Sequence, residues 1–488
     1  MTSRLSDAVR RLLTDVLARY RDCPWVVDLL RDQLARLAEP PRIAVAGGRS
    51  SGKSTLVNAI LGEEIGPVEL TDGRPVFVWY EDAPVPRITT DAPRGARREL
   101  AASRAARGLR VDAPGSADEV VDVVVGGRRR LLRHMTVVDT PAVPAAGEES
   151  RAAVAERILR VADVVLYLTP DVRGSDLGFL RHAHEGMVAA AAPTNLLLVL
   201  SRADEAGGGR PDALLSARQA ARHQGRHPRI APLCLGVVAV SGLVALAGRV
   251  LGEAEFGALA ALAAMPRADL EPYLLSADRF VSTSASLPVD EVARRRLLAR
   301  LGLVGVRLAM TLIRVAGCDS RAKLAAELVR RSGFVELREA IGRYVVDRAE
   351  TVRARSALLA VERVLRAEPR PGSGELFARL EQIVVGAHEF REIRLLAALH
   401  SARVRFDAEL AREARRLLGG DGTEIIARLG VEREARRDEL WARAMAALTR
   451  WRGLSDDPVL DTAQRRAARV VVRSCEGILA ELAGHYYL

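Results

Sequence analysis

A phosphate-binding pattern constrains this chain more than any other feature of its sequence. The segment Gly47–Thr55 reads Gly-Gly-Arg-Ser-Ser-Gly-Lys-Ser-Thr and matches G-x-x-x-x-G-K-[ST]. An apolar run, Ile43–Ala46, comes directly before it, and a helical pattern follows. Since the pattern needs this strand–loop–helix context, we expect an α/β domain with a P-loop. The alternative is a glycine-rich turn with an incidental Lys-Ser pair, and the flanking segments disfavour it.

The residue types in the loop suit the binding of phosphate. Glycines let backbone N–H groups turn toward the phosphates, and the helix N-terminus adds the positive end of its dipole. Lys53 is one of only two lysines in an arginine-rich chain, and we expect it to bridge β- and γ-phosphates. Ser54 is expected to give its hydroxyl to Mg²⁺. The predicted phosphate contacts are Gly47, Gly48, Ser50, Ser51, Gly52, Lys53, Ser54 and Thr55.

A second candidate site residue ends another buried run. Val137-Val-Asp139 is followed by Thr-Pro-Ala142. In P-loop proteins an aspartate at this place approaches Mg²⁺, so Ser54 and Asp139 are the predicted metal residues; a helix or turn cap is the alternative for Asp139. The position of Ala142 usually holds a glycine whose N–H contacts the γ-phosphate. Alanine keeps the N–H but cannot adopt every conformation open to glycine, so nucleotide sensing is expected to be altered.

A third segment predicts guanine recognition. Ser201-Arg202-Ala-Asp204 follows the apolar run Leu196–Leu200. A carboxylate there can accept hydrogen bonds from N1 and N2 of guanine, which adenine does not offer in that arrangement. Arg202 stands where [NT]-K-x-D has lysine, and its planar guanidinium can still stack on a base. Ser241, after the next predicted strand, is a further candidate base contact. The predicted ligands are therefore GTP or GDP with Mg²⁺.

Hydrophobic patterning divides the chain into three parts. Residues 1–38 read as helices, and an alternation of apolar strands and helices occupies 39–250. After about residue 250 long helical patterns follow to 488, the longest over 291–316, 334–367 and 387–418. We expect the helices of 1–38 to pack into the same helical-bundle stalk. The predicted strands are Ile43–Ala46, Val76–Tyr80, Val121–Val125, Thr136–Val138, Val164–Leu168, Leu196–Leu200 and Leu235–Val240.

Charge and cysteine content narrow the partners. The formal net charge is +11, but it is spread along the chain without basic–aromatic interleaving, so nucleic acid is not an expected partner. Four separated cysteines form no CxxC pair, which fits a reducing cytosol. The first residues lack the apolar core of a secretory signal. The apolar run Cys234–Gly248 is too short to span a bilayer, so any membrane contact is expected to be peripheral.

Several segments together resemble one family. The stretch Gly47–Gly62 resembles the start of bacterial dynamin-like GTPases, and Ile65-Gly-Pro, Trp79-Tyr80, Ser201–Glu205 and Val238–Leu243 look like the actinobacterial branch. In the helical part, Leu275–Phe280, Leu301–Arg307 and Glu327–Gly333 are similar to the isoniazid-inducible dynamin-like proteins of mycobacteria. The resemblance covers nearly the whole chain. The helical motifs separate it from GTPases in general.

The resemblance implies a dynamin-type GTPase head with a helical stalk. It also implies GTP hydrolysis coupled to self-assembly, or to pairing with a sister dynamin-like protein. The expected place is the cytoplasm, peripherally on the inner face of the plasma membrane with anionic lipid as a partner. The expected process is remodelling or maintenance of that membrane.

Departures from the family pattern predict weak turnover. The catalytic candidates are Lys53, Ser54, Arg49 and Thr71. Arg49 stands where related heads carry Gln or another helper, and an arginine there could stabilise charge in cis. The switch threonine is expected about two residues before the Val-Val-x-Trp-Tyr strand, where this chain has Arg74-Pro75; its nearest threonine, Thr71, lies three residues early. With Ala142, these departures lead us to expect nucleotide binding with slow hydrolysis.

Two questions stay open at the level of sequence. The segment 315–334, with Lys323 beside Leu328 and Phe334, is a candidate membrane-facing tip of the stalk; an amphipathic helix packed inside the bundle is the alternative. The function is either that of a mechanochemical GTPase or that of a hydrolysis-impaired partner of a sister GTPase. A regulatory or ribosome-associated GTPase fused to helices is a third reading, which the stalk and the absence of RNA-binding patches disfavour.

Overall fold

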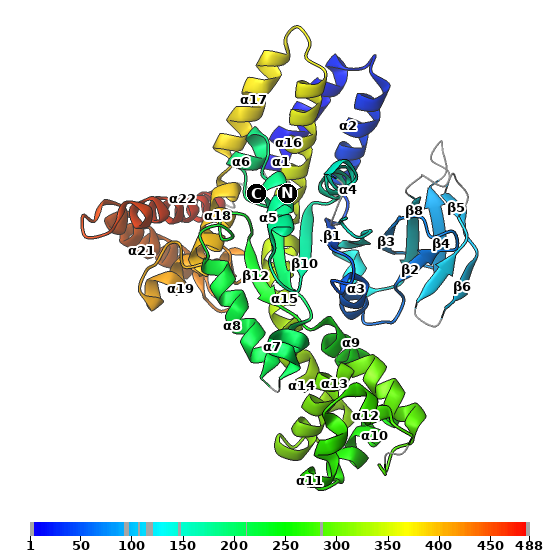
Figure 1. The fold of residues 1–488 in the computed structure, drawn as a ribbon. Coiled ribbons are helices and arrows are strands. Elements are labelled where there is room, and N and C mark those ends of the chain that lie inside the picture. Colours follow the sequence, from blue (N-terminus) through cyan, green and yellow to red (C-terminus); the bar gives the residue numbers. More distant parts are fainter. Residues whose placement is uncertain are drawn as a thin grey trace.

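A mixed nine-stranded sheet forms the centre of the molecule (Figure 1). The computed structural model describes residues 4–91, 97–105, 108–113, 121–144, 148–210, 212–283 and 286–484. The strand order is β12-β11-β10-β1-β9-β3-β8-β4-β5. A small second sheet has the order β2-β7-β6. The strands are β1 (Arg42–Gly47), β2 (Val68–Leu70), β3 (Val76–Asp82), β4 (Arg87–Asp91), β5 (Arg97–Glu99), β6 (Ala102–Arg104), β7 (Leu109–Val111), β8 (Val121–Gly127), β9 (Thr136–Asp139), β10 (Val164–Thr169), β11 (Leu196–Leu200) and β12 (Gly236–Ala239).

Five neighbouring strands, β12, β11, β10, β1 and β9, are parallel. Their residues are buried almost without exception, which explains the continuous apolar runs in the sequence. In register, Gly47 pairs with Leu168 and Val45 pairs with Asp139. The carboxyl ends of these strands therefore meet at one edge, where ligands of open α/β sheets bind. The far side is antiparallel at β3–β9, β4–β8 and β4–β5.

Helices cover both faces of the parallel strands. One face packs against α4 (Glu148–Val161), α5 (Gly174–His182) and α8 (Ala213–Arg226). The other packs against α3 (Lys53–Leu61), α9 (Gly242–Val250) and α15 (Phe334–Ile341), and its core continues into the C-terminal helices. The shorter elements are η1 (Arg130–Arg133), η2 (Ala203–Glu205), α7 (Ala206–Gly209) and the π-turn η4 (Gly342–Val346). This is the expected α/β P-loop domain.

The two N-terminal helices lie beside helices that are more than 300 residues later in the chain. The helices α1 (Arg4–Arg19) and α2 (Pro24–Arg36) pack against α16 (Ala349–Ala367) and α17 (Ser373–Gly386), at the top of Figure 1. Leu12, Leu30, Leu358 and Phe390 share their fully buried core. The short helix α6 (Met187–Ala191) joins this N-terminal bundle to the sheet domain, because Glu362 accepts hydrogen bonds from the backbone N–H groups of Met187 and Val188.

A second helical group extends below the sheet. This lower lobe comprises α10 (Glu253–Ala264), α11 (Arg267–Leu270), η3 (Glu271–Leu274), α12 (Ala277–Val281), α13 (Glu291–Val315) and α14 (Arg321–Arg331). The helix α14 packs on α9 so closely that a Cβ added at Gly248 would lie 2.9 Å from the Ala325 carbonyl oxygen. Leu324, Leu328 and Phe334 are buried. These three apolar side chains of the candidate tip 315–334 thus face the protein interior in this structure, whereas Val315 is exposed.

A third group, the C-terminal lobe, contains α18 (His388–His400), α19 (Ala408–Leu417), α20 (Ile425–Leu429), α21 (Arg437–Asp456) and α22 (Thr462–Gly484). The helical stalk of this fold is therefore divided into three groups. The long predicted helices over 334–367 and 387–418 are each interrupted, the first by the π-turn and the second by a non-helical segment at 401–407. Gly302, with φ 65° and ψ 170°, likewise breaks α13. No helix in the described ranges has the length and apolar character needed to cross a membrane.

Candidate functional site

The loop between β1 and α3 has the backbone that its glycines predict. Gly47 has φ +146°, and a Cβ there would lie 2.2 Å from the Leu168 carbonyl oxygen, so no other residue fits. Gly52 has φ +90° and precedes the first turn of α3. Ser50 also adopts a positive φ of 58°. The chain therefore turns tightly at the end of a buried strand and points the N-terminus of α3 at the loop, as phosphate binding requires.

Lys53 lies across this loop. Its Nζ donates hydrogen bonds to the Gly48 carbonyl at 2.9 Å and the Gly47 carbonyl at 3.2 Å. Burial lowers the pKa of Lys53 below its usual value, while the charge of Asp139 raises it. The ammonium is held where a phosphate would lie over the loop, and its two carbonyl contacts are of the kind that an anion can replace.

Asp139 is a buried carboxylate without full hydrogen bonding. It ends β9 beside β1, and its Oδ1 accepts no hydrogen bond from the described residues. Burial raises the pKa of Asp139 to about 6, against the lowering effects of a hydrogen bond from Ser54 and of the Lys53 charge. An unsatisfied carboxylate oxygen beside a serine hydroxyl suits a hard cation with oxygen ligands. Ser54 and Asp139 therefore fit the predicted Mg²⁺.

The segment after Asp139 is fastened to the P-loop strand. Thr140 Oγ1 donates to the Val45 carbonyl at 3.0 Å, and the Val143 N–H donates to the Gly47 carbonyl at 3.1 Å. Ala142, which is half-buried, lies between these two attachments. The Gly47 carbonyl thus accepts from both Lys53 and Val143, which couples the position of Lys53 to this segment.

A cavity of about 350 Å³ joins the P-loop to the predicted base-recognition residues. Ser50, Gly52 and Thr55 line one end, and Ser201, Arg202 and Asp204 line the other. Asp204 is buried, and the Ser201 hydroxyl is buried without a hydrogen-bond partner in the described part of the chain. The volume and the small number of polar groups are those of a small-molecule site.

Arg202 and Ser241 differ from their predicted use. The Arg202 backbone is left-handed, with φ 53°, and its side chain forms an ion pair with Glu205 at 2.6 Å. The Ser241 side chain caps α9 by accepting from the Val244 N–H at 3.2 Å and is fully buried. Ser241 therefore lies behind the cavity wall, where it caps α9, and its neighbour Gly242 lines the cavity.

The two positions expected at the switch do not reach the P-loop. Thr71 follows β2, and its Oγ1 donates to Asp112 Oδ1 at 3.3 Å beside β7. Arg74 is buried, pairs with Asp72 at 2.6 Å and donates to the Ala113 carbonyl. Both residues stabilise the connection between the small sheet and β3. In this structure neither Thr71 nor Arg74 lines the cavity beside the phosphate loop.

Arg49 is exposed at the outer turn of the loop. It forms no hydrogen bond or ion pair with any residue that the structure describes. Its guanidinium is therefore free to reach either a bound phosphate or solvent. The remaining loop serine, Ser51, is buried, and its hydroxyl has no hydrogen-bond partner among the described residues. This is expected of a hydroxyl close to where the phosphates would bind.

Sequence reasoning missed part of the cavity wall. Leu168, Glu205 and Leu243 line it together with Val240. Leu168 and Val240 were within or at the ends of predicted strands, so the rule that parallel strands end at one edge could have found them. Leu243 comes from α9 and had no polar signal in the sequence.

Comparison with known proteins gives one strong relationship. The isoniazid-induced protein IniC of Mycobacterium tuberculosis, in strains CDC 1551 / Oshkosh and ATCC 25618 / H37Rv, is 36% identical over 493 residues, covering 98% of both chains. Two solved chains of an oligomerised bacterial dynamin pair, described as a mechanism for the long-range sensing and tethering of membranes, align with TM-scores of 0.30 and 0.29. Their identities are 11% and 12%, covering 98% and 99% of this chain and 75% and 74% of theirs. No protein-family model matches.

Proposed function

The chain belongs to the IniC family of dynamin-like proteins, and from this premise we propose that it binds GTP and GDP and hydrolyses GTP slowly. The observation that carries the proposal is the cavity of about 350 Å³ between the P-loop and Asp204. It brings together residues almost 150 positions apart in the sequence. A nucleotide bound there would have its phosphates at α3 and its base at the end of β11.

The phosphate end would use the chain's own donors. Backbone N–H groups of the loop and the α3 N-terminus would hold the β-phosphate. Lys53 would exchange its contacts with the Gly47 and Gly48 carbonyls for phosphate oxygens. Ser54 and Asp139 would hold Mg²⁺, which neutralises charge on the β- and γ-phosphates when bound.

The base end would discriminate by hydrogen bonding. The buried Asp204 carboxylate would accept from N1 and N2 of guanine, and adenine would leave it unpaired. An unpaired buried carboxylate is costly, so ATP should bind much more weakly. Arg202 would have to release Glu205 before its guanidinium could stack on the base.

We expect slow hydrolysis because the residues near the expected γ-phosphate position are poorly placed to orient an attacking water. Thr71 is held by Asp112 and Arg74 by Asp72, so neither is placed to orient the attacking water. The segment carrying Ala142 is attached to the Gly47 carbonyl through Val143. Besides Lys53, Arg49 is the charged residue of the loop that could stabilise the transition state, and no residue in the described ranges orients its side chain.

Single-turnover and steady-state GTP hydrolysis test this proposal. Wild-type turnover should be roughly 10⁻³ s⁻¹ or below, in the range of unassisted GTPases. Lys53→Ala should lose binding, whereas Lys323→Ala, which changes the chain's other lysine, should behave as wild type. Wild-type turnover near 1 s⁻¹ would contradict slow hydrolysis, and equal GTP binding by Lys53→Ala would contradict the site.

A second candidate function is that of a hydrolysis-impaired partner of a sister dynamin-like GTPase. The observation favouring it is the buried Arg74, which fixes the pre-β3 segment where related chains have a switch threonine. In this case GTP would bind without turnover, and anionic vesicles would not restore hydrolysis. Comparing turnover with and without vesicles separates the two candidates.

Family membership also supports assembly at a membrane. We include in the proposal self-association or pairing with a sister protein, and a peripheral position on anionic lipid at the inner face of the plasma membrane. The buried face of α14 argues that the segment 315–334 contacts lipid only after rearrangement. Vesicle flotation with wild type and Leu328→Glu would test that segment, since unchanged binding would remove it from consideration.

A further inference from the structure

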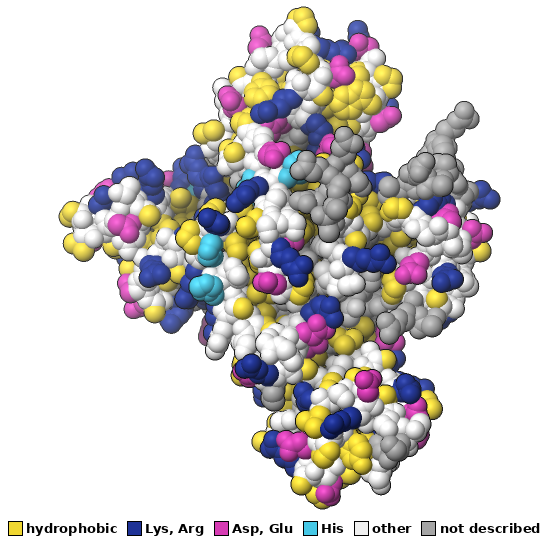
Figure 2. All heavy atoms as spheres, viewed as in Figure 1, with side chains coloured by type: hydrophobic (Ala, Val, Ile, Leu, Met, Phe, Trp, Pro, Cys, Tyr) yellow, Lys and Arg dark blue, Asp and Glu magenta, His cyan; other side chains and the backbone are white. Residues whose placement is uncertain are grey.

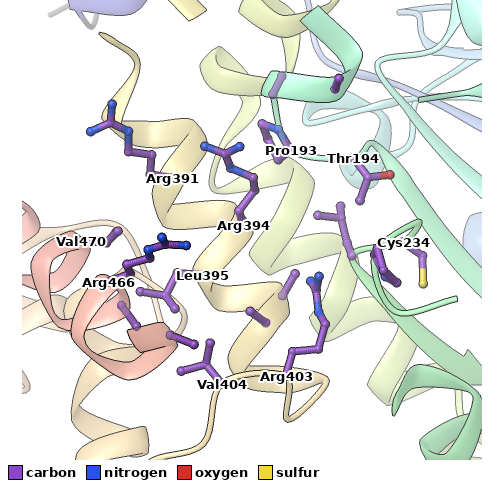
Figure 3. Close-up of a pocket in the computed structure, with 18 of the residues that line it drawn as sticks. Pro193, Thr194, Cys234, Arg391, Arg394, Leu395, Arg403, Val404, Arg466 and Val470 are labelled. Atoms are coloured by element: carbon purple, nitrogen blue, oxygen red, sulfur yellow. The ribbon is translucent and has the colours of Figure 1, made fainter. Parts of the chain in front are cut away.

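A second cavity, of about 500 Å³, lies between the sheet domain and the C-terminal lobe (Figure 3). Its walls come from the Pro193–Thr194 turn before β11, the Cys234–Leu235 turn before β12, and the helices α18 and α22. These turns are at the amino ends of the parallel strands, whereas the P-loop lies at the carboxyl ends. The cavity is therefore separate from the proposed nucleotide site.

Unpaired arginines gather around this cavity. In Figure 3, Arg394, Arg403 and Arg466 point into the space between α18, α22 and the Pro193–Thr194 turn. Arg394 and Arg466 form no hydrogen bond or ion pair with a described residue, and Arg403 reaches only the Ser401 hydroxyl at 3.1 Å. Arg391, at the rim, donates to the Val385 carbonyl. Among the residues that the structure describes, no aspartate or glutamate lines the cavity.

On the opposite face of α18, two arginines are paired with a buried carboxylate. There Glu392 is buried and accepts from Arg428 at 2.6 Å and pairs with Arg348 at 3.5 Å. On that face a carboxylate lies between the two arginines, whereas none of the described carboxylates lies among the arginines of the cavity face. Figure 2 shows basic side chains gathered over the same region of the surface, beside α18. Like charges held close together repel unless an anion lies between them.

The wall behind the cavity adds further positive potential. Arg355 is fully buried, and its Nε donates to the Pro193 carbonyl at 2.7 Å while its other two nitrogens have no partner in the described structure. His184 lines the cavity and has a buried, unpartnered Nε2. Burial lowers the pKa of His184, and the Arg355 charge lowers it further. The His184 Nδ1 lies 2.9 Å from the Leu180 carbonyl, so the neutral ring carries its proton there and its Nε2 is a hydrogen-bond acceptor. Of these two residues, Arg355 therefore supplies the positive charge.

Apart from Thr194, whose hydroxyl donates to the Leu233 carbonyl, the remaining lining is apolar. Leu235, Leu395, Val404 and Val470 form it, together with alanines of α18 and α22. A ligand that satisfies the whole cavity therefore has a charged end for the guanidinium groups and a small apolar part. Guanidinium groups pair with phosphate oxygens in bidentate fashion, which makes phosphate the best match for the charged end.

We propose that this cavity binds a phosphate-bearing anion with a small apolar portion, held by Arg394, Arg403 and Arg466. The phosphate could belong to a free phosphorylated metabolite or to a phospholipid headgroup. Because the ligand would touch both the sheet domain and α18 with α22, its binding stabilises the docked position of the C-terminal lobe. Binding of the phosphate-bearing ligand would thus favour the docked position of the C-terminal lobe over an undocked one.

Two soluble probes distinguish the sources of the phosphate. Inorganic pyrophosphate stands for a free phosphate, and dihexanoyl phosphatidic acid stands for a headgroup; dihexanoyl phosphatidylcholine is the zwitterionic control. Calorimetry is done on the full chain carrying Lys53→Ala, so that the P-loop does not compete. Whichever anionic probe binds more tightly assigns the source.

The deciding variant is Arg394→Gln with Arg466→Gln, added to that background. Its matched control is Arg412→Gln with Arg443→Gln, which removes two exposed arginines of α19 and α21 outside the cavity. We expect the cavity pair to weaken anionic-probe binding at least tenfold and the control pair to change it less than twofold. Absence of binding by both anionic probes, or equal loss in the two double variants, overturns the proposal.

A measurement on the unmodified sequence guards against misfolded variants. Arginine modification by phenylglyoxal is followed by peptide mass spectrometry with and without each probe. Protection of Arg394, Arg403 and Arg466, with Arg443 unprotected, is the expected result. Equal modification of the cavity arginines at saturating probe overturns the proposal.

Discussion

The P-loop and the arginine cavity are two anion sites built in opposite ways. The P-loop is one contiguous segment, Gly47–Thr55, whose backbone and single lysine face the ligand. The arginine cavity is assembled from turns near residues 193 and 234 and helices near residues 394 and 466. The first depends on local backbone geometry, and the second depends on how the C-terminal lobe docks on the sheet. Variants that affect one and spare the other test this contrast.

The largest expected effect is on stability, at the contact between the start of α15 and the end of β12. Gly333 has φ +83°, and a Cβ there would lie 1.9 Å from the Ala239 carbonyl oxygen at the end of β12. Gly333→Ala should lower the free energy of unfolding by about 3 kcal/mol, because strain and overlap add. Gly374→Ala, where nothing lies within 4 Å, is the control and should be nearly neutral. Denaturant unfolding measures both, and equal midpoints would show that α15 is not fixed against β12.

The second-largest effect is expected on GTP affinity, when the P-loop lysine is removed. Lys53→Ala should weaken GTP binding about 100-fold, since charge-assisted hydrogen bonds of this kind contribute up to about 3 kcal/mol. Stability should change little. Fluorescence titration with labelled GTP gives the affinity, and Lys323→Ala, in an exposed ion pair with Asp319, should match wild type. A loss below threefold would mean that Lys53 does not contact the nucleotide.

A smaller effect, opposite in sign, is expected at Asp139. Its pKa of about 6 lies above the unfolded value, so the stability due to its neutral form is present below about pH 4 and is lost as pH rises through 6. Asp139→Asn should therefore stabilise the nucleotide-free chain by about 2 kcal/mol above pH 6, with the gain shrinking toward pH 4.

Thermal unfolding between pH 4 and 7.5 checks the Asp139 prediction. Asp28→Asn, at an exposed position of α2, is the control and should show no such pH-dependent gain. Destabilisation by Asp139→Asn at pH 7.5 without nucleotide would show that the carboxylate is already satisfied.

The smallest effect sharpens the separation of the two sites. Arg394→Gln with Arg466→Gln should leave GTP affinity within twofold of wild type, because these residues lie at the amino ends of the strands. The same titration measures it. A loss above tenfold would show that the two sites are not independent.

The same contrast explains what the sequence could predict. The seven apolar runs became strands because continuous burial in a parallel sheet leaves a continuous apolar pattern. Gly47, Asp139 and Asp204 could be predicted as site residues because each follows such an apolar run. The short strands β5, β6 and β7 lacked any periodic signal.

Tertiary packing accounts for the rest. The π-turn at Gly342–Val346 and the break in α13 at Gly302 interrupt long helical patterns, and helical periodicity does not encode such interruptions. The positions of Thr71 and Arg74 relative to β3 in the sequence predicted a place near the γ-phosphate. In the structure Asp112 holds Thr71, and Asp72 holds Arg74, away from the P-loop. The sequence did not predict the arginine cavity, because its arginines lie on different elements and are separated by up to 75 positions, from Arg391 to Arg466.

The most direct test of guanine recognition is the Asp204→Asn exchange measured with GTP, ATP and xanthosine triphosphate. Xanthine carries a carbonyl where guanine has its amino group, so an asparagine amide can pair with it and a carboxylate cannot. We expect wild type to prefer GTP over ATP by about 100-fold, and Asp204→Asn to lose GTP binding and gain xanthosine triphosphate binding. Equal binding of GTP and ATP by wild type, or an unchanged preference in Asp204→Asn, would contradict this expectation.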